Sequence, residues 1–192
     1  MFTKVSYSTF LRACKQLTQL EDDQIKKTYD NLVSPLRIHN ETSGYKFFLP
    51  YDVILNPGVP TPLVSGFRAD MGAVFATVQT GGNNRSLKDN TTQTTIDKAQ
   101  VFLCLYPLDS LIMRNIIYLN PCKIIDQAAC HNPRTEGLIV EQIVSMQPQP
   151  MKLPAGIPFC QGVIQPYFTM AIHEENPHKG FDSHMDDAVM MH

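Results

Sequence analysis

At residues 106–126 the chain reads YPLDSLIMRNIIYLNPCKIID, a turn-like start followed by an apolar segment that ends on an acid. Ser110 provides a hydroxyl that donates and accepts, Arg114 a planar fork of donors, and Asp126 a carboxylate behind two isoleucines. These groups suit a phosphorylated or otherwise polar ligand. They suit equally a solvated turn, an exposed arginine and a strand-end acid, which are the commoner uses of these residue types. The rest of the chain has to decide between the two interpretations.

The composition predicts one globular domain that acts inside the cell. The 192 residues suffice for a hydrophobic core, and a net charge of −2 argues against nucleic acid as the main partner. No window is long and apolar enough to span a membrane, and we expect no signal peptide because the first residues lack an apolar segment. The five cysteines follow no disulfide framework. We therefore expect free, mostly buried thiols in a reducing compartment, the cytoplasm or the nucleus.

The N-terminal part of the chain predicts helix. Apolar residues recur at helical spacing from Phe10 to Leu17, and the acidic run at residues 21–23 is typical of the start of a second helix. Residues 1–35 are therefore predicted to form a helical extension, a hairpin or two short helices that dock against a larger body. A free amphipathic helix that binds a partner is the less favoured alternative.

Beyond residue 36 the pattern changes to short strands separated by turns, which is typical of a mainly β sandwich or distorted barrel. We predict a β domain over residues 36–172 and a flexible C-terminal arm over residues 173–192. The polar residues 79–95 are predicted to form a long exposed loop, and residues 127–136 a second loop. The predicted strands are residues 43–49, 52–55, 63–69, 73–78, 101–105, 137–144 and 159–167, with further strand material in 111–125.

Five short motifs follow one another along this β domain and the arm: SGYKF at residues 43–47, PLDSL at 107–111, IID at 124–126, AGIPFCQ at 155–161 and GFDS at 180–183. In this order, and at roughly these spacings, they resemble the motifs of the trimeric dUTPase and dCTP deaminase superfamily. The second resembles Pro-Arg-Ser-Ser-Leu, and the last resembles the Gly-Phe-Gly-Ser of the mobile C-terminus. The resemblance spans roughly residues 36–183 and includes dUTPase-derived viral proteins.

The resemblance implies a β-clip fold and a homotrimer with nucleotide-like pockets between subunits, crossed by the C-terminal arms. It implies that Asp126 orients the attacking water, and Arg114 stands where the deaminase branch has the arginine of Ser-Leu-x-x-Arg. The residues that it implies for nucleotide binding are Ser110, Gln161, Phe181 and Ser183. The strand GLIVEQ, residues 137–142, resembles the deaminase motif Gly-x-Ile-x-Leu-Glu, with Gln142 at the place of the proton-shuttling glutamate.

Several positions depart from the family pattern. Lys46 replaces an acid that helps to hold magnesium, and an ammonium group cannot bind a hard cation. Leu108 replaces the phosphate-binding arginine, and the carboxylate of Asp109 beside it would repel a triphosphate. An alternative register would put Asn132 at the place of the acid, and neither an amide there nor Gln142 can serve as a base.

These observations leave two functional hypotheses. The favoured one is a protein that has lost catalysis and serves as a binding, regulatory or structural homotrimer, with a deoxynucleotide or a protein as partner and with virion association as an alternative setting. The other is a divergent enzyme that hydrolyses dUTP, then with Mg²⁺, or deaminates dCTP. We expect no metal site otherwise, because the sulfur and imidazole groups match no usual zinc spacing; these are Cys122, Cys130, His131, His173, His178 and His184.

Overall fold

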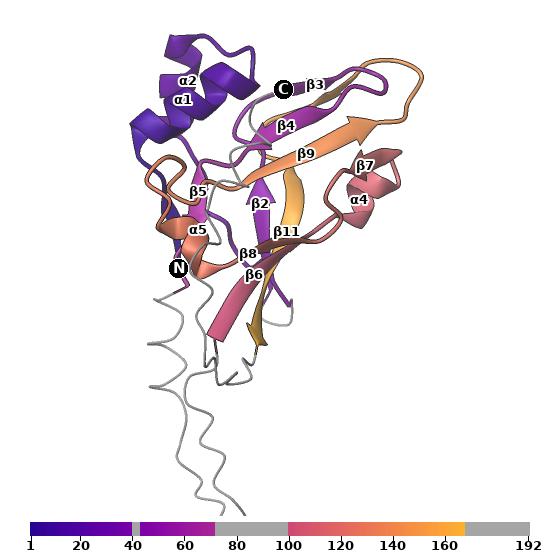
Figure 1. The fold of residues 1–192 in the computed structure, drawn as a ribbon. Coiled ribbons are helices and arrows are strands. Elements are labelled where there is room, and N and C mark those ends of the chain that lie inside the picture. The colour runs from indigo at the N-terminus through magenta and orange to yellow at the C-terminus, as the bar shows by residue number, and fades with distance from the viewer. Residues whose placement is uncertain (40–42, 72–99, 168–192) are drawn as a thin grey trace, which may run out of the picture.

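The computed structural model describes residues 1–39, 43–71 and 100–167 (Figure 1). The strands are β1 (Phe2–Lys4), β2 (Tyr45–Phe48), β3 (Val53–Leu55), β4 (Thr61–Val64), β5 (Phe67–Ala69), β6 (Gln100–Tyr106), β7 (Ile116–Tyr118), β8 (Lys123–Ile125), β9 (Val140–Ser145), β10 (Met151–Leu153) and β11 (Pro158–Tyr167). The helices are α1 (Tyr7–Leu17), α2 (Asp22–Asp30), α4 (Asp109–Ile112) and α5 (Gln127–Cys130). Predictions for residues 73–78, 79–95 and 173–192 lie outside these described ranges.

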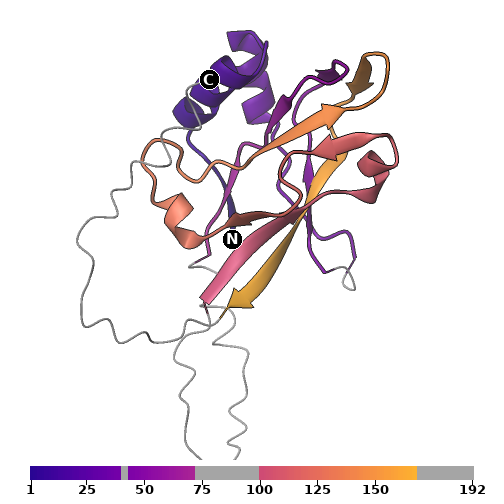
Figure 2. The same cartoon turned by 45° about the vertical axis from the view of Figure 1, so that its right-hand side comes forward.

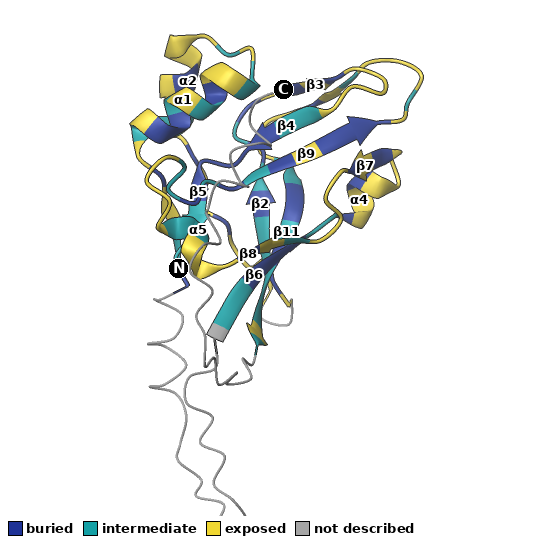
Figure 3. Ribbon diagram, in the orientation of Figure 1, coloured by how far each residue is buried: buried dark blue, intermediate teal, exposed yellow. Residues whose placement is uncertain are grey.

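The two predicted N-terminal helices are confirmed. Ser6 caps α1 by accepting a hydrogen bond from the backbone of Thr9, and Glu21 forms a reciprocal capping box with Gln24 at the start of α2. Their apolar faces are buried in the same hydrophobic cluster as the strands, whereas their outer faces are exposed (Figure 3). The first residues also add strand β1, which pairs with β5.

The β architecture confirms a mainly β fold. All pairings between the described strands are antiparallel, and these strands form several small sheets rather than one closed barrel. A four-stranded sheet has the order β2-β11-β6-β8, and a three-stranded sheet has the order β4-β9-β7. Both sheets contribute residues to one hydrophobic core, and Figure 3 shows their buried segments in dark blue. Strand β6 lies inside the larger sheet, as its nearly continuous apolar run predicts.

Two short helices correct the predictions for residues 111–125 and 127–136. Helix α4 takes the beginning of the first segment, which was predicted as strand, and β7 and β8 follow it. Helix α5 occupies the predicted loop, because Asp126 caps it and the following Gln-Ala-Ala favours helix. A helix of four residues is too short to show the 3.6-residue period on which a prediction depends.

The predicted strand at residues 63–69 is divided into β4 and β5. Gly66 separates them with φ of 80°, a left-handed conformation in which glycine carries no steric penalty. As a result, β4 pairs with β9 whereas β5 pairs with β1. Strands β1 and β10 were not predicted. Each has three residues and is held by pairing with a distant segment, so local sequence carries little signal for it.

Candidate functional site

Ser110 and Arg114 lie at one end of the molecule, on and just after α4. Both are exposed, and the carbonyl oxygen of Arg114 accepts a hydrogen bond of 3.0 Å from the side chain of Gln147. Leu108, the residue before α4, is only 5% exposed, so its side chain belongs to the interior. Asp109 begins the helix and is exposed. The only charge of this first helical turn is therefore negative.

Gln161 lies close to this end of the molecule. On β11 it is paired with Lys46 of β2 and with Tyr106, the last residue of β6 before the chain turns into α4. Its side-chain amide is 3.5 Å from the hydroxyl of Ser43. The two residues of the first and fourth motifs, Ser43 and Gln161, are thus brought together by the sheet.

Asp126 lies at another place. It follows β8, which runs antiparallel to β6, so it is directed toward the beginning of β6 rather than toward α4. In both ribbon views α4 and α5 are well separated (Figures 1 and 2). One carboxylate oxygen of Asp126 accepts a hydrogen bond of 3.2 Å from the backbone N–H of Ala129. A single chain therefore does not bring Asp126 together with Ser110 and Arg114.

A hollow of about 410 Å³ lies beside Asp126. It is formed by the end of β8, helix α5 and the segment that leads into β9. Its polar lining comes from four side chains, Lys123, Asp126, Asn132 and Thr135, and its apolar lining includes Ile125 and Leu138. Sequence reasoning singled out Asp126 and weighed Asn132, but it missed Lys123 and Thr135, which no motif marks.

The segment that closes the hollow is tied to the N-terminus of α1. The Glu136 carboxylate accepts hydrogen bonds from the Ser6 backbone N–H at 2.9 Å, from the Thr9 hydroxyl at 2.7 Å and from the Ser6 hydroxyl. The side chain of Arg12 also donates to the carbonyl oxygen of Arg134. The hydrogen bonds from the Ser6 side chain and backbone, followed by that from Thr9, lower the pKa of Glu136 to about 2.

Glycine is required where this segment turns into the strand. Glu136 and Gly137 have φ of 53° and 74°, so two consecutive residues are left-handed. A Cβ on Gly137 would lie 3.0 Å from the Cα of Cys130 and 3.1 Å from the carbonyl oxygen of Ala129. Helix α5 can therefore pack on this turn only because residue 137 has no side chain.

Strand β9 separates its two neighbouring polar residues. Gln142, at the place of the deaminase shuttle, is exposed, whereas Glu141 points to the opposite face and is 2% exposed. Neither carboxylate oxygen of Glu141 has a hydrogen-bond partner among the described residues. Burial raises the pKa of Glu141 to about 7, and the ammonium of Lys123 opposes this shift.

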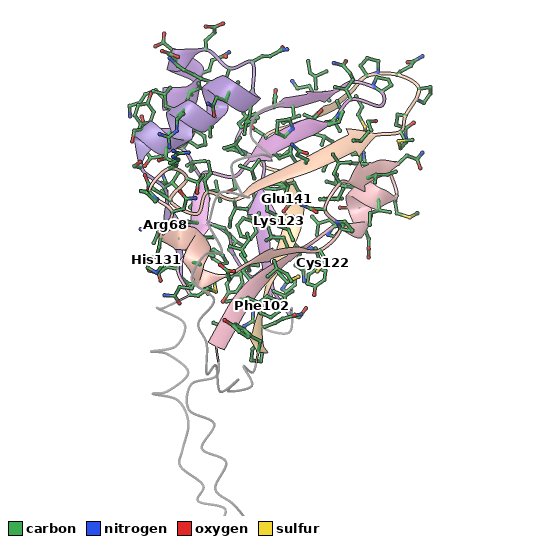
Figure 4. All side chains as sticks on the ribbon, viewed as in Figure 1. Arg68, Phe102, Cys122, Lys123, His131 and Glu141 are labelled. Atoms are coloured by element: carbon green, nitrogen blue, oxygen red, sulfur yellow. The ribbon has the colours of Figure 1, made fainter. Side chains whose placement is uncertain are left out.

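Lys123 connects this interior charge with the hollow. Its ammonium donates a hydrogen bond of 2.5 Å to the carbonyl oxygen of Val140 on β9, and it also lines the hollow. Figure 4 shows Lys123 and Glu141 near each other between β8 and β9. The ammonium is therefore held by a backbone carbonyl rather than by the carboxylate, and Glu141 is left without a donor among the described residues.

The residues of this chain do not fit the magnesium site of the family that it resembles. Lys46 occupies β2 beside Gln161, where a metal ligand would need an oxygen. Within residues 1–39, 43–71 and 100–167, no group of three or more His, Cys, Asp or Glu side chains is arranged to hold a metal ion. In the same ranges no helix is long and apolar enough to cross a membrane. Phe181 and Ser183 lie outside the described residues.

The structure is similar to solved dUTPases. A dUTPase from Streptococcus mutans superimposes with a TM-score of 0.57 and 20% identity, over 88% of this chain and 97% of that one. The dUTPase of Staphylococcus bacteriophage 80alpha gives a TM-score of 0.52 and 12% identity, over 78% and 93% of the two chains. No family model matches the sequence, and no curated protein matches it significantly. The likeness shows a dUTPase-like fold.

Proposed function

We propose that this protein is a homotrimer with a dUTPase-like fold that has lost catalysis and acts by binding, as a regulatory or structural component. Its ligand is a deoxynucleotide or a protein partner, and we place it in the cytoplasm or the nucleus, with association with a virion as the alternative. The dUTPase-like fold supports the pocket. The departures from the family pattern at Lys46, Leu108, Asp109 and Gln142 support the loss of chemistry.

The pair Leu108 and Asp109 supports this proposal most directly. At the place where the resembling motif has a phosphate-binding arginine, the Leu108 side chain is buried and offers no charge. The next residue presents an exposed carboxylate, which repels the phosphates of a nucleotide. Stabilisation of the developing negative charge by positioned donors is usually the largest contribution to phosphoryl transfer, and at residues 108 and 109 an apolar side chain and a carboxylate stand in place of such donors.

A regulatory role has a parallel among the structural neighbours. The dUTPases of phage 80alpha are described as controlling the transfer of virulence genes by a proto-oncogenic G protein-like mechanism. This description concerns those proteins alone. It supports the proposal to the extent that a dUTPase-like fold can serve a regulatory purpose.

The homotrimer is the second part of the proposal. Within one chain, α4 with Ser110 and Arg114 is well separated from the hollow beside Asp126. Assembly around a three-fold axis, which the family resemblance implies, would let α4 of one subunit approach the hollow of the next. Light scattering at micromolar concentration is expected to give three times the mass of one chain, and a monomeric mass would contradict this part.

The alternative function is a divergent dUTP diphosphatase or dCTP deaminase. The observation in its favour is that Asp126 is exposed at the hollow, beside Lys123 and Asn132. A carboxylate in such a place can orient a water molecule for attack. Residues 108 and 109, at the place of the family's phosphate-binding motif, offer no positive charge, which weighs against this alternative.

Release of pyrophosphate and of ammonia from dUTP and dCTP, with and without Mg²⁺, distinguishes the two functions. We expect no turnover by the full-length protein. The matched variants are Asp126→Asn, which keeps the helix cap but removes the charge, and Asp126→Ala, which removes both. Turnover by the native protein that disappears in Asp126→Asn would overturn the non-catalytic proposal.

Thermal unfolding with dUMP, or with an imido analogue of dUTP, tests the binding part. A rise in the melting temperature without turnover supports a residual nucleotide pocket. If millimolar ligand does not raise the melting temperature, a deoxynucleotide ligand is excluded and the proposed partner is a protein.

A further inference from the structure

Two cysteine thiols meet between strands β6 and β8. The sulfur atoms of Cys104 and Cys122 are 2.9 Å apart. This distance exceeds the length of a disulfide bond by about 1 Å or less. Cys104 is 1% exposed, whereas Cys122, which Figure 4 labels, is exposed. One thiol of the pair is therefore shielded and the other is open to a reagent from solution.

The sheet register explains the contact. Cys104 is paired with Ile124, and Leu105 with Lys123, so Cys122 immediately precedes the paired residues of β8. Because side chains alternate along a strand, Cys104, Cys122 and Ile124 lie on the same face of the sheet. Ile124 on that face is 62% exposed, and Cys104 is outside the main hydrophobic cluster. The pair thus lies on the face of the sheet that carries the exposed Ile124, apart from the main hydrophobic cluster.

The surroundings distinguish this pair from the other cysteines. Tyr106, which accepts a hydrogen bond of 3.0 Å from the Gln165 side chain, interacts with the Cys104 thiol. Cys14 and Cys160 are buried, and Cys130 donates to the carbonyl oxygen of Ala69 at 2.7 Å. Among the five cysteines, all of which the structure describes, only Cys104 and Cys122 are close to another thiol.

We propose that Cys104 and Cys122 form a reversible disulfide by exchange with a low-molecular-weight disulfide of the glutathione class. The exposed Cys122 thiolate attacks one sulfur of the small disulfide and displaces a thiolate. The Cys104 thiolate then attacks the Cys122 sulfur and displaces the second. Two electrons pass from the protein dithiol to the small disulfide, the two protein thiol protons are taken up by the displaced thiolates, and two small thiols leave.

The bond would close a ring over the segment that carries α4 and β7. Residues 105–121 lie between the two cysteines and include Ser110 and Arg114. Oxidation would thereby fasten the α4 region to the edge of the four-stranded sheet. A ring of this size is expected to raise the melting temperature by about 5–10 °C. This inference is independent of the proposed function, because it concerns thiol chemistry alone.

The test uses the full-length protein in buffers of reduced and oxidised glutathione at set ratios. Samples are alkylated after denaturation and mapped by mass spectrometry. We expect oxidation to remove two alkylatable thiols, to remove two hydrogens from the mass, and to yield one linked peptide pair with Cys104 and Cys122. Cys122→Ser should abolish the linked pair and the rise in melting temperature, whereas Cys130→Ser, which removes another partly accessible thiol, should leave both unchanged.

Three results would overturn the proposal. One is a stable glutathione adduct on Cys122 with no internal bond, which would mean that Cys104 cannot reach it. Another is a bond between Cys122 and Cys130, or between two chains. The third is five alkylatable thiols at every glutathione ratio. If Cys122→Ser does not fold, Cys122→Ala and Cys104→Ser provide the same comparison.

Discussion

Glu136 and Glu141 are five residues apart in the sequence, yet their carboxylates have opposite environments and opposite pKa shifts. Glu136, in the segment before β9, receives three hydrogen bonds from Ser6 and Thr9, and its pKa falls to about 2. Glu141, inside β9, receives none from the described residues, and burial raises its pKa to about 7. The difference shows that the donors within reach decide whether a carboxylate stabilises this fold.

The two groups make opposite contributions to the pH dependence of stability. The stabilisation by Glu136 is present above the unfolded-state pKa of about 4.5 and is lost as the pH falls toward 2. For Glu141 the unfolded chain releases its proton near pH 4.5 whereas the folded chain holds it until about pH 7, so stability falls as the pH rises through that range. These two groups together predict greatest stability near pH 4.5.

The largest effect is expected for Glu141→Leu, which removes the buried carboxylate. At pH 8 the free energy of unfolding should rise by about 3 kcal/mol. This is the cost of ionising a buried carboxyl whose pKa is raised from 4.5 to about 7. The gain should disappear near pH 4.5. Urea unfolding at several pH values measures it, with Gln142→Leu on the exposed face as the control. A loss of stability at pH 8 would show that Glu141 has a partner that the burial argument overlooks.

Gly137→Ala tests the turn that joins the two carboxylates. We expect a loss of about 2 kcal/mol in the free energy of unfolding, because the new Cβ meets the backbone of α5 in a left-handed conformation. Gly156→Ala is the matched control. Its φ is 83°, but no described atom lies near the new Cβ, so it should lose only about 1 kcal/mol. Equal losses in urea unfolding would mean that contact with α5 is unimportant.

Glu136→Gln should destabilise the protein by about 1 kcal/mol at pH 7, a value reduced for the solvent screening of a partly exposed group. The difference from the native protein should vanish as the pH falls toward 2, where the native carboxylate is also neutral. A double-mutant cycle with Thr9→Val checks the assignment, because part of the effect should be lost once the Thr9 donor is absent. An effect that does not depend on pH would contradict the electrostatic explanation.

The smallest effect is expected at Asp126. Asp126→Ala removes the cap of α5 and should cost about 0.5–1 kcal/mol, whereas Asp126→Asn should be close to neutral because the amide oxygen can still accept from Ala129. Thermal unfolding compares the two. A larger loss in Asp126→Asn than in Asp126→Ala would show that the charge of Asp126, rather than its cap, matters for the fold.

Much of the fold was predictable because its pattern is local. The two N-terminal helices carry a 3.6-residue period and an acidic start, and β6 carries a continuous apolar run. Local pattern did not predict the short helices α4 and α5 or the three-residue strands β1 and β10, because so few residues show no period. These elements are stabilised by helix caps and by pairing with distant segments. For the candidate site, the order of the motifs singled out Asp126. No local signal in the sequence indicated that Glu136 anchors the segment before β9 or that Lys123 lines the hollow.

Residue type and order alone were enough to indicate a β-rich, dUTPase-like chain, and they placed Lys46, Leu108 and Asp109 at positions where the resemblance predicts metal or phosphate binding. Only the tertiary structure decided which side chains meet. The one-residue alternation of β9 buries Glu141 and exposes Gln142, and the β6–β8 register brings Cys104 to Cys122 across 18 residues of sequence. The type of a residue can be read at a single position of the sequence. Its burial and its contacts depend on distant segments that come together only when the chain folds.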